Sequence, residues 1–260
     1  MIEFIHVRRT YGDKVAVADL TLTIAPGEVF AYLGPNGAGK TTTIKMLVGL
    51  LRPTLGTVRV CGFDVVQQSR QSHRLIGYVP DEPYLYDKLT GREFLWFVGE
   101  VHGFKRDNIR TRVERQVKRF ELDEFVDILT ENYSHGMKQR VAFAAAMLHD
   151  PAVVIVDEPM VGLDPRSAKL VKTLLKELAG EGKSVLMSTH SLSVAEQIAD
   201  RIGIIEGGKL HFEGTVSQLR SAMGDEGTAL EELYLRFTAQ RRDDPVSEKT
   251  AVPATEVSVP

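Results

Sequence analysis

A glycine-rich segment carries the residues whose types and spacing most clearly predict chemistry. It fits the pattern G-x-x-x-x-G-K-[ST], and its members are Gly34, Pro35, Asn36, Gly37, Ala38, Gly39, Lys40, Thr41 and Thr42. An apolar run, residues 29–33, precedes it, and apolar residues at helical spacing follow it up to Leu51. A strand, a glycine loop and a helix in this order are what a phosphate-binding loop requires.

The chemistry of this loop follows from its residue types. Glycines lack Cβ, so the chain can turn tightly and point backbone N–H groups at an anion. The start of the following helix adds partial positive charge. In this pattern Lys40 reaches the β- and γ-phosphates and the Thr41 hydroxyl binds Mg²⁺. We therefore predict a nucleoside triphosphate site, and the flanking strand and helix argue against an accidental glycine-rich turn.

Acidic residues and a histidine follow two further apolar runs. Asp157 and Glu158 come directly after residues 152–156, and His190 follows residues 184–189. Asp157 is placed to hold Mg²⁺, and Glu158 to polarise an attacking water. His190 is placed to contact a γ-phosphate, because the tips of parallel strands gather at the ligand crevice. Solvated acids and a structural histidine are the alternative interpretation.

Composition limits the function classes. The 260 residues include 32 basic and 35 acidic ones, a net charge of −3, without a basic block that would support a nucleic-acid partner. Cys61 is the single cysteine, which fits a reducing compartment. The first residues lack a signal-peptide pattern, and no apolar run reaches about 18 residues. We expect another chain to bring this one to a membrane.

The pattern of elements predicts an α/β chain with a helical insertion. Thr90 and Glu93 form a capping box before an apolar stripe at helical spacing. The remaining expected elements are strands at 2–8, 15–24, 57–61, 76–79, 152–156 and 184–189, helices at 108–120, 135–149, 166–178 and 194–199, and a hairpin over 202–212. Two short helices are expected near 216–223 and 229–238. Residues 241–260 are polar and aperiodic, and we predict them to be disordered.

In combination these residues resemble the ATP-binding subunit of an ATP-binding cassette (ABC) transporter from Ile2 to about Met223. The motifs stand in the family's order: Tyr11 as the adenine-stacking aromatic, residues 34–42 as Walker A, Asp81 at the Gln-loop position, residues 134–140 as the signature, residues 153–158 as Walker B, residues 162–164 as the D-loop and His190 as the switch histidine. Seven motifs in order are far more specific than any one of them.

The resemblance implies a P-loop NTPase core, with a mainly parallel sheet flanked by helices. To this it adds an N-terminal antiparallel β subdomain and an inserted helical subdomain at about 84–150. The ATP-binding domain would span 1–223, a short helical extension 224–240, and a disordered tail 241–260.

The resemblance also implies a mechanism that uses ATP and Mg²⁺. Two ABC subunits, the same chain or different ones, would meet head to tail. Ser134 and Gly136 of one would face the nucleotide on the other's Walker A loop. Glu158 would act as general base and His190 as its γ-phosphate partner, while Asp157, Thr41 and Asp81 would serve the metal. Hydrolysis would reset a separate transmembrane permease.

Two motifs, the signature and the Gln loop, depart from the family pattern. The signature is usually Leu-Ser-Gly-Gly-Gln, whereas this chain has His135 and Met137 at its third and fifth positions. We expect the signature to work with altered contacts. Asp81 stands where the family has glutamine, so its metal role is the weaker expectation, while its place at the interface with the membrane subunit is expected to persist.

The type of transporter rests on finer similarity. Residues 78–83 and 85–90 resemble those of bacterial drug and antibiotic exporters, and the extension after residue 223 is short. We therefore expect an export ATPase at the cytoplasmic face of a bacterial membrane. The alternatives are an importer subunit, a regulatory cassette with little turnover, and a soluble ABC protein acting on ribosomes or DNA.

Overall fold

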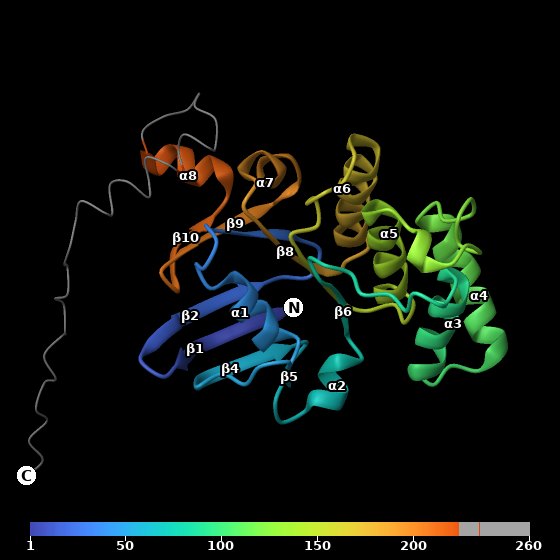
Figure 1. Ribbon diagram of the computed structural model, residues 1–260. Coiled ribbons are helices and arrows are strands. Elements are labelled where there is room, and N and C mark those ends of the chain that lie inside the picture. Colours follow the sequence, from blue (N-terminus) through green and yellow to red (C-terminus); the bar gives the residue numbers. More distant parts are fainter. Residues whose placement is uncertain (224–233, 235–260) are drawn as a thin grey trace, which may run out of the picture. The chain divides into compact units, whose positions relative to one another are not determined.

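The computed structural model describes residues 1–223 and 234. The chain divides into two units, Met1–Val216 and Ser217–Pro260. The first unit contains two sheets and nearly all of the described helices, as Figure 1 shows.

The smaller sheet is four-stranded and antiparallel in the order β2-β1-β4-β5. Its strands are β1 (Ile2–Tyr11), β2 (Lys14–Ile24), β4 (Leu55–Val60) and β5 (Phe63–Asp64). This is the antiparallel subdomain that the family resemblance implied. The strand expected over 2–8 is longer than predicted and continues to Tyr11, which pairs with Lys14 across the hairpin.

The larger sheet has the order β10-β9-β3-β8-β7-β6 and is parallel except at β10. Its strands are β3 (Val29–Leu33), β6 (Ile76–Val79), β7 (Val153–Asp157), β8 (Ser184–Thr189), β9 (Arg201–Glu206) and β10 (Lys209–Gly214). Every residue of β3, β7 and β8 is buried, which fits their mainly apolar sequences. The parallel order brings the carboxyl ends of these strands to one edge, where the predicted site residues follow them.

Helices of the core connect these strands. They are α1 (Lys40–Leu47), α2 (Ser69–His73), α6 (Pro165–Gly180) and α7 (Leu192–Ile198). Helix α6 follows Walker B, and Asp164 caps its start. The Asp164 carboxylate accepts hydrogen bonds from the N–H groups of Arg166 and Ser167, and Pro165 takes the first helical position.

The predicted helical insertion is present between β6 and β7. It consists of α3 (Gly91–Val101), α4 (Arg106–Arg119), the short 3₁₀ helix η1 (Thr130–Asn132) and α5 (His135–Ala146), which gather on one side of the parallel sheet in Figure 1. The capping box of Thr90 and Glu93 is confirmed. The apolar stripe of α3 is only partly buried: Leu95 is in the core, whereas Phe97 and Val101 are 41% and 69% exposed.

The predicted helix near 216–223 is confirmed as α8 (Val216–Met223). The helix expected near 229–238 and the tail 241–260 lie outside the described residues, Tyr234 apart. Within the part of the chain that the structure describes, the helices fall short of the length and apolarity needed to cross a membrane.

Candidate nucleotide site

The phosphate-binding loop joins β3 to α1, and two of its glycines are required by close backbone approach. Gly39 caps α1 with φ +114°, and a Cβ there would lie 2.5 Å from the carbonyl oxygen of Ala16. A Cβ on Gly34 would lie 2.4 Å from the carbonyl oxygen of Ile205. Real Cβ atoms do not approach backbone oxygens so closely, so any side chain at either position would displace the loop.

Lys40 is a buried cation held inside the loop. Its side chain is 6% exposed, and Nζ donates to the carbonyl oxygens of Gly34 at 2.6 Å and Pro35 at 3.3 Å. The same Nζ lies 3.6 Å from Oε1 of Glu158. A buried charge is stable only when it is paired and hydrogen-bonded, so this ammonium is fixed in place by groups that the loop and the strand tip supply.

A cleft of about 500 Å³ opens in front of this lysine. Its walls come from the β1–β2 hairpin, the phosphate loop, the segment after β6 and the tip of β7: Tyr11, Lys14, Ala16, Pro35, Asn36, Gly37, Gly39, Lys40, Thr41, Thr42, Asp81, Asp157 and Glu158. The structure therefore brings together most of the residues that the sequence predicted to bind nucleotide and metal. Gly34 and Ala38 lie behind the lining, where they shape the loop.

Asp157 ends β7 and is 1% exposed. The Ser188 hydroxyl donates a hydrogen bond to its Oδ1. Burial raises the pKa of Asp157, and the negative charges of Asp81 and Glu158 raise it further, against the lowering effect of Ser188. Burial together with Asp157 and Asp81 also raises the pKa of Tyr78 to about 12. Asp81 thus lies close enough to Asp157 to act on it electrostatically.

The oxygen donors in the cleft fit Mg²⁺. The Thr41 hydroxyl and the Asp157 carboxylate are hard ligands, and a cation would offset the unfavourable burial of Asp157. Among the residues that the structure describes, no group of three or more His, Cys, Asp or Glu side chains is arranged to hold a metal.

Glu158 has an unusual backbone conformation and is held between Ser188 and His190. Its φ is +47°, and its N–H donates to the carbonyl and hydroxyl oxygens of Ser188 at 3.2 and 3.1 Å. On its other side Nδ1 of His190 lies 3.0 Å from Oε2, and the backbone N–H of His190 donates to the same oxygen at 3.3 Å. A strained backbone at a partly buried carboxylate of this kind points to function.

The signature residues stand apart from this cleft. Ser134 caps α5, and its hydroxyl accepts a hydrogen bond from the N–H of Met137 at 3.3 Å. Ser134 and His135 are exposed, and His135 lines a neighbouring cleft of about 490 Å³ with Asn36, Glu158 and His190. The exposed helix start is thus free to meet a ligand on another subunit, as the family pattern implied.

Several residues of the site were not predicted from the sequence. Lys14 and Ala16 line the cleft because β1 and β2 form a hairpin beside the loop, a placement with no local signal. Ser188 contacts both acids from β8, where it is one small residue in an apolar strand. The sequence could have indicated this role, because Ser188 lies two residues before His190 on a buried strand.

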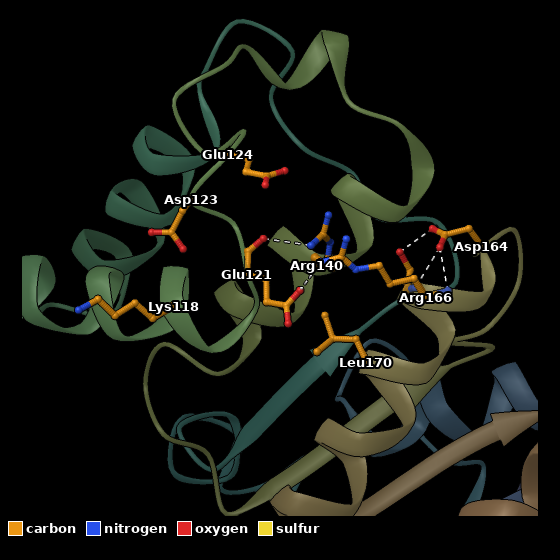
Figure 2. A pocket seen from close by; sticks show the side chains of 9 residues that line it. Lys118, Glu121, Asp123, Glu124, Arg140, Asp164, Arg166 and Leu170 are labelled. Atoms are coloured by element: carbon orange, nitrogen blue, oxygen red, sulfur yellow. Dashed lines mark hydrogen bonds and ion pairs between the residues drawn. The ribbon is translucent and has the colours of Figure 1, made fainter.

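A further cleft, of about 300 Å³, lies between the helical insertion and the start of α6, and Figure 2 shows its charged lining. Arg140 donates to the Glu121 carbonyl at 3.0 Å, Arg166 forms an ion pair with the Glu121 carboxylate at 3.4 Å, and Asp164 caps α6. Both arginines contact Glu121, so we interpret these contacts as a structural bridge between α6 and the insertion.

The fold and the first cleft define a nucleotide-binding domain of the P-loop class. Residues 17–161 match the family described as "ABC transporter". The chain is 36% identical to "Nod factor export ATP-binding protein I" of Paraburkholderia xenovorans, over 96% of this chain and 83% of that protein. It is 38% identical to "Daunorubicin resistance ATP-binding protein DrrA3" of Streptomyces coeruleorubidus, over 84% and 69%.

Solved structures agree. A structure titled "Structure of ATP binding subunit of ABC transporter" has a TM-score of 0.85 and 32% identity, covering 92% of this chain and 99% of that one. The dimeric post-hydrolysis state of the cassette MJ0796 bound to ADP and Pi has a TM-score of 0.76 and 27% identity, covering 83% and 99%. The chain belongs to the ABC transporter family, and the fold predicted from its motifs is confirmed.

Proposed function

We propose that this chain is an ATPase subunit that powers export through a separate membrane-spanning permease. The observation that carries the proposal is that Lys40 and His190 both approach the Glu158 carboxylate, the lysine at 3.6 Å and the histidine at 3.0 Å. A cation for the phosphates, a carboxylate base and a γ-phosphate partner are the parts that phosphoryl transfer to water needs.

Each residue has a defined task in this proposal. Loop N–H groups and Lys40 bind the phosphates, and Tyr11 supports the adenine. Thr41 and Asp157 hold Mg²⁺, with Asp81 as a further carboxylate beside them; the ion would neutralise charge on the β- and γ-phosphates. Glu158 accepts the proton of the attacking water, and His190 orients Glu158 while facing the γ-phosphate.

We further propose that the working unit is a head-to-tail pair of cassettes. The nucleotide cleft of one chain lacks the signature residues Ser134 and Gly136, which lie outside its lining. A second subunit would supply them, so that the exposed start of α5 meets the γ-phosphate. The dimeric ADP- and Pi-bound state of the similar cassette MJ0796 supports this arrangement.

The direction of transport is proposed from the relatives. Those reported above are named for Nod factor export and daunorubicin resistance, which favours export over import. For the permease contact we propose the aromatic surface of Tyr84, Tyr86 and Phe97, which are 82%, 48% and 41% exposed. The rings of Tyr84 and Phe97 pack on Tyr86 at 6.1 and 5.6 Å, and such an apolar cluster is typical of a protein interface.

We also propose that the chain works at the cytoplasmic face of a membrane, without a nucleic-acid partner. We propose residues 1–223 as the ATP-binding domain, with the helical insertion at about 84–150. The described helices of that insertion span 91–146, which supports these bounds.

Phosphate release by the purified chain with Mg-ATP tests the proposal. Glu158→Gln should lower turnover about 10²- to 10⁴-fold, because general base catalysis contributes about that much. Glu177→Gln, an exposed carboxylate on α6, is the matched control and should turn over at the parent rate. A Glu158→Gln variant as fast as the parent would show that another group activates the water.

A further inference from the structure

An arginine lies against the aromatic ring at the edge of the nucleotide cleft. Arg9 and Tyr11 are two residues apart on β1, so their side chains share one face of the strand. The guanidinium carbon of Arg9 lies 4.5 Å from the centre of the Tyr11 ring, and Tyr11 is 45% exposed. This is the geometry of a cation–π contact.

The guanidinium is itself anchored. Nη1 of Arg9 donates to the carbonyl oxygen of Arg52 at 3.0 Å. The same turn is tied to β1 by Thr54, whose N–H donates to the Arg8 carbonyl at 2.7 Å and whose hydroxyl accepts from the N–H of Thr10 at 3.1 Å. This turn comes shortly after α1, the helix that starts with Lys40, so the ring is connected to the end of the phosphate-loop helix.

The Tyr11 ring borders the cleft, whereas Arg9 does not. Tyr11, Lys14 and Ala16 line the cleft, whereas Arg9, within the described part of the chain, is not among its lining residues. One face of the tyrosine ring is therefore taken by the guanidinium, and ring surface remains turned toward the nucleotide site.

We propose that Arg9 is a positioning residue for base binding: it holds the Tyr11 ring as a rigid platform on which the purine of the nucleotide stacks. The inference rests on the proposed function of the cleft. A ring with two rotatable side-chain bonds at a hairpin end loses entropy when a base stacks on it. The anchored guanidinium removes part of that loss in advance, and its charge also draws electron density from the ring face that meets the base.

Calorimetric titration of the parent and variants with ATP and with inorganic tripolyphosphate tests the proposal. Tripolyphosphate occupies the loop but carries no base. Arg9→Ala should weaken ATP binding about fivefold, the size of an exposed cation–π contact, and leave tripolyphosphate binding unchanged. Arg8→Ala is the matched control, because it removes the same charge from the neighbouring exposed position and should leave both affinities unchanged.

A second pair of variants separates positioning from a general structural role. In a Tyr11→Ala background Arg9→Ala should have no further effect on ATP affinity, because the platform is already gone. Arg9→Lys keeps a cation near the ring and should recover part of the loss, and it serves as the working variant if Arg9→Ala proves unstable.

The outcomes are distinct. A parent chain that binds neither ATP nor tripolyphosphate would overturn the proposed function. Unchanged ATP affinity in Arg9→Ala would overturn this inference alone. Equal weakening of ATP and tripolyphosphate, or the same loss with and without Tyr11, would also overturn it, because Arg9 would then act on the fold or on the phosphates.

Discussion

The nucleotide cleft and the start of helix α5 are both predicted to contact ATP, the cleft its own nucleotide and α5 that of another subunit, yet they are built in opposite ways. In the cleft, Lys40 and Asp157 are buried and already hydrogen-bonded by the chain itself. At α5, Ser134 and His135 are exposed, and Ser134 uses its hydroxyl only to cap its own helix. A region completed within one chain tolerates little change, whereas a region completed by another chain depends on assembly.

The largest expected effect breaks the cleft through its backbone. Gly39→Ala should lower the free energy of unfolding by at least about 3 kcal/mol, because the new Cβ meets the Ala16 carbonyl at 2.5 Å in a left-handed conformation. Gly103→Ala is the control: φ there is +76°, but nothing lies within 4 Å of its Cβ, so it should cost only about 1 kcal/mol. Urea denaturation measures both, and equal losses would show that the close contact is unimportant.

Lys40→Ala should weaken Mg-ATP binding about a hundredfold, because a buried cation that pairs with phosphate is lost and Glu158 keeps one partner fewer. Lys45→Ala, which removes an exposed cation from the same helix, should leave affinity unchanged. Calorimetric titration decides the matter. Parent-like affinity in Lys40→Ala would refute the Walker A assignment.

The α5 region is tested by comparing two helix caps. Ser134→Ala and Thr90→Ala each remove a side-chain cap and should each lower stability by about 1 kcal/mol. Only Ser134→Ala should also weaken ATP-driven dimerisation, by roughly tenfold, since a hydrogen bond to a charged phosphate is lost as well. Sedimentation of both variants with ATP gives the answer, and equal dimerisation would mean that Ser134 is merely a cap.

The smallest expected effect is a gain of stability at a site residue. Because burial raises the pKa of Asp157 above its unfolded value, folding favours the protonated form. The stabilisation is present in full below the unfolded pKa and is lost as the pH rises through the folded pKa, so at pH 7 the ionised carboxylate destabilises the fold.

Asp157→Asn should therefore raise the free energy of unfolding at pH 7 by about 1 kcal/mol in the absence of metal, while weakening Mg²⁺-dependent ATP binding. Urea denaturation at pH 7 and at pH 3 measures the difference, which should shrink at the lower pH. A variant less stable than the parent at pH 7 would mean that the Ser188 hydrogen bond outweighs the cost of burial.

The contrast between the two regions also explains what the sequence could predict. The phosphate loop, the two acids at the end of β7 and His190 follow buried strands, and parallel pairing gathers such ends at one edge. The helix cap at Ser134 is a local motif, so it could also be predicted from the sequence. The placement of Lys14 beside the cleft arises from a hairpin register, and the contacts of Ser188 with Asp157 and Glu158 arise from pairing between strands distant in sequence, so their partners could not be predicted from local patterns.

The central claim is that the cleft of one chain is completed by the α5 start of another. The most direct test is the mass in solution of the Glu158→Gln variant, by light scattering, with and without Mg-ATP. The account predicts a monomer without nucleotide and a dimer with Mg-ATP, and loss of that dimer when Ser134→Ala is added. A variant that binds Mg-ATP and forms the same dimer with or without Ser134 would contradict it.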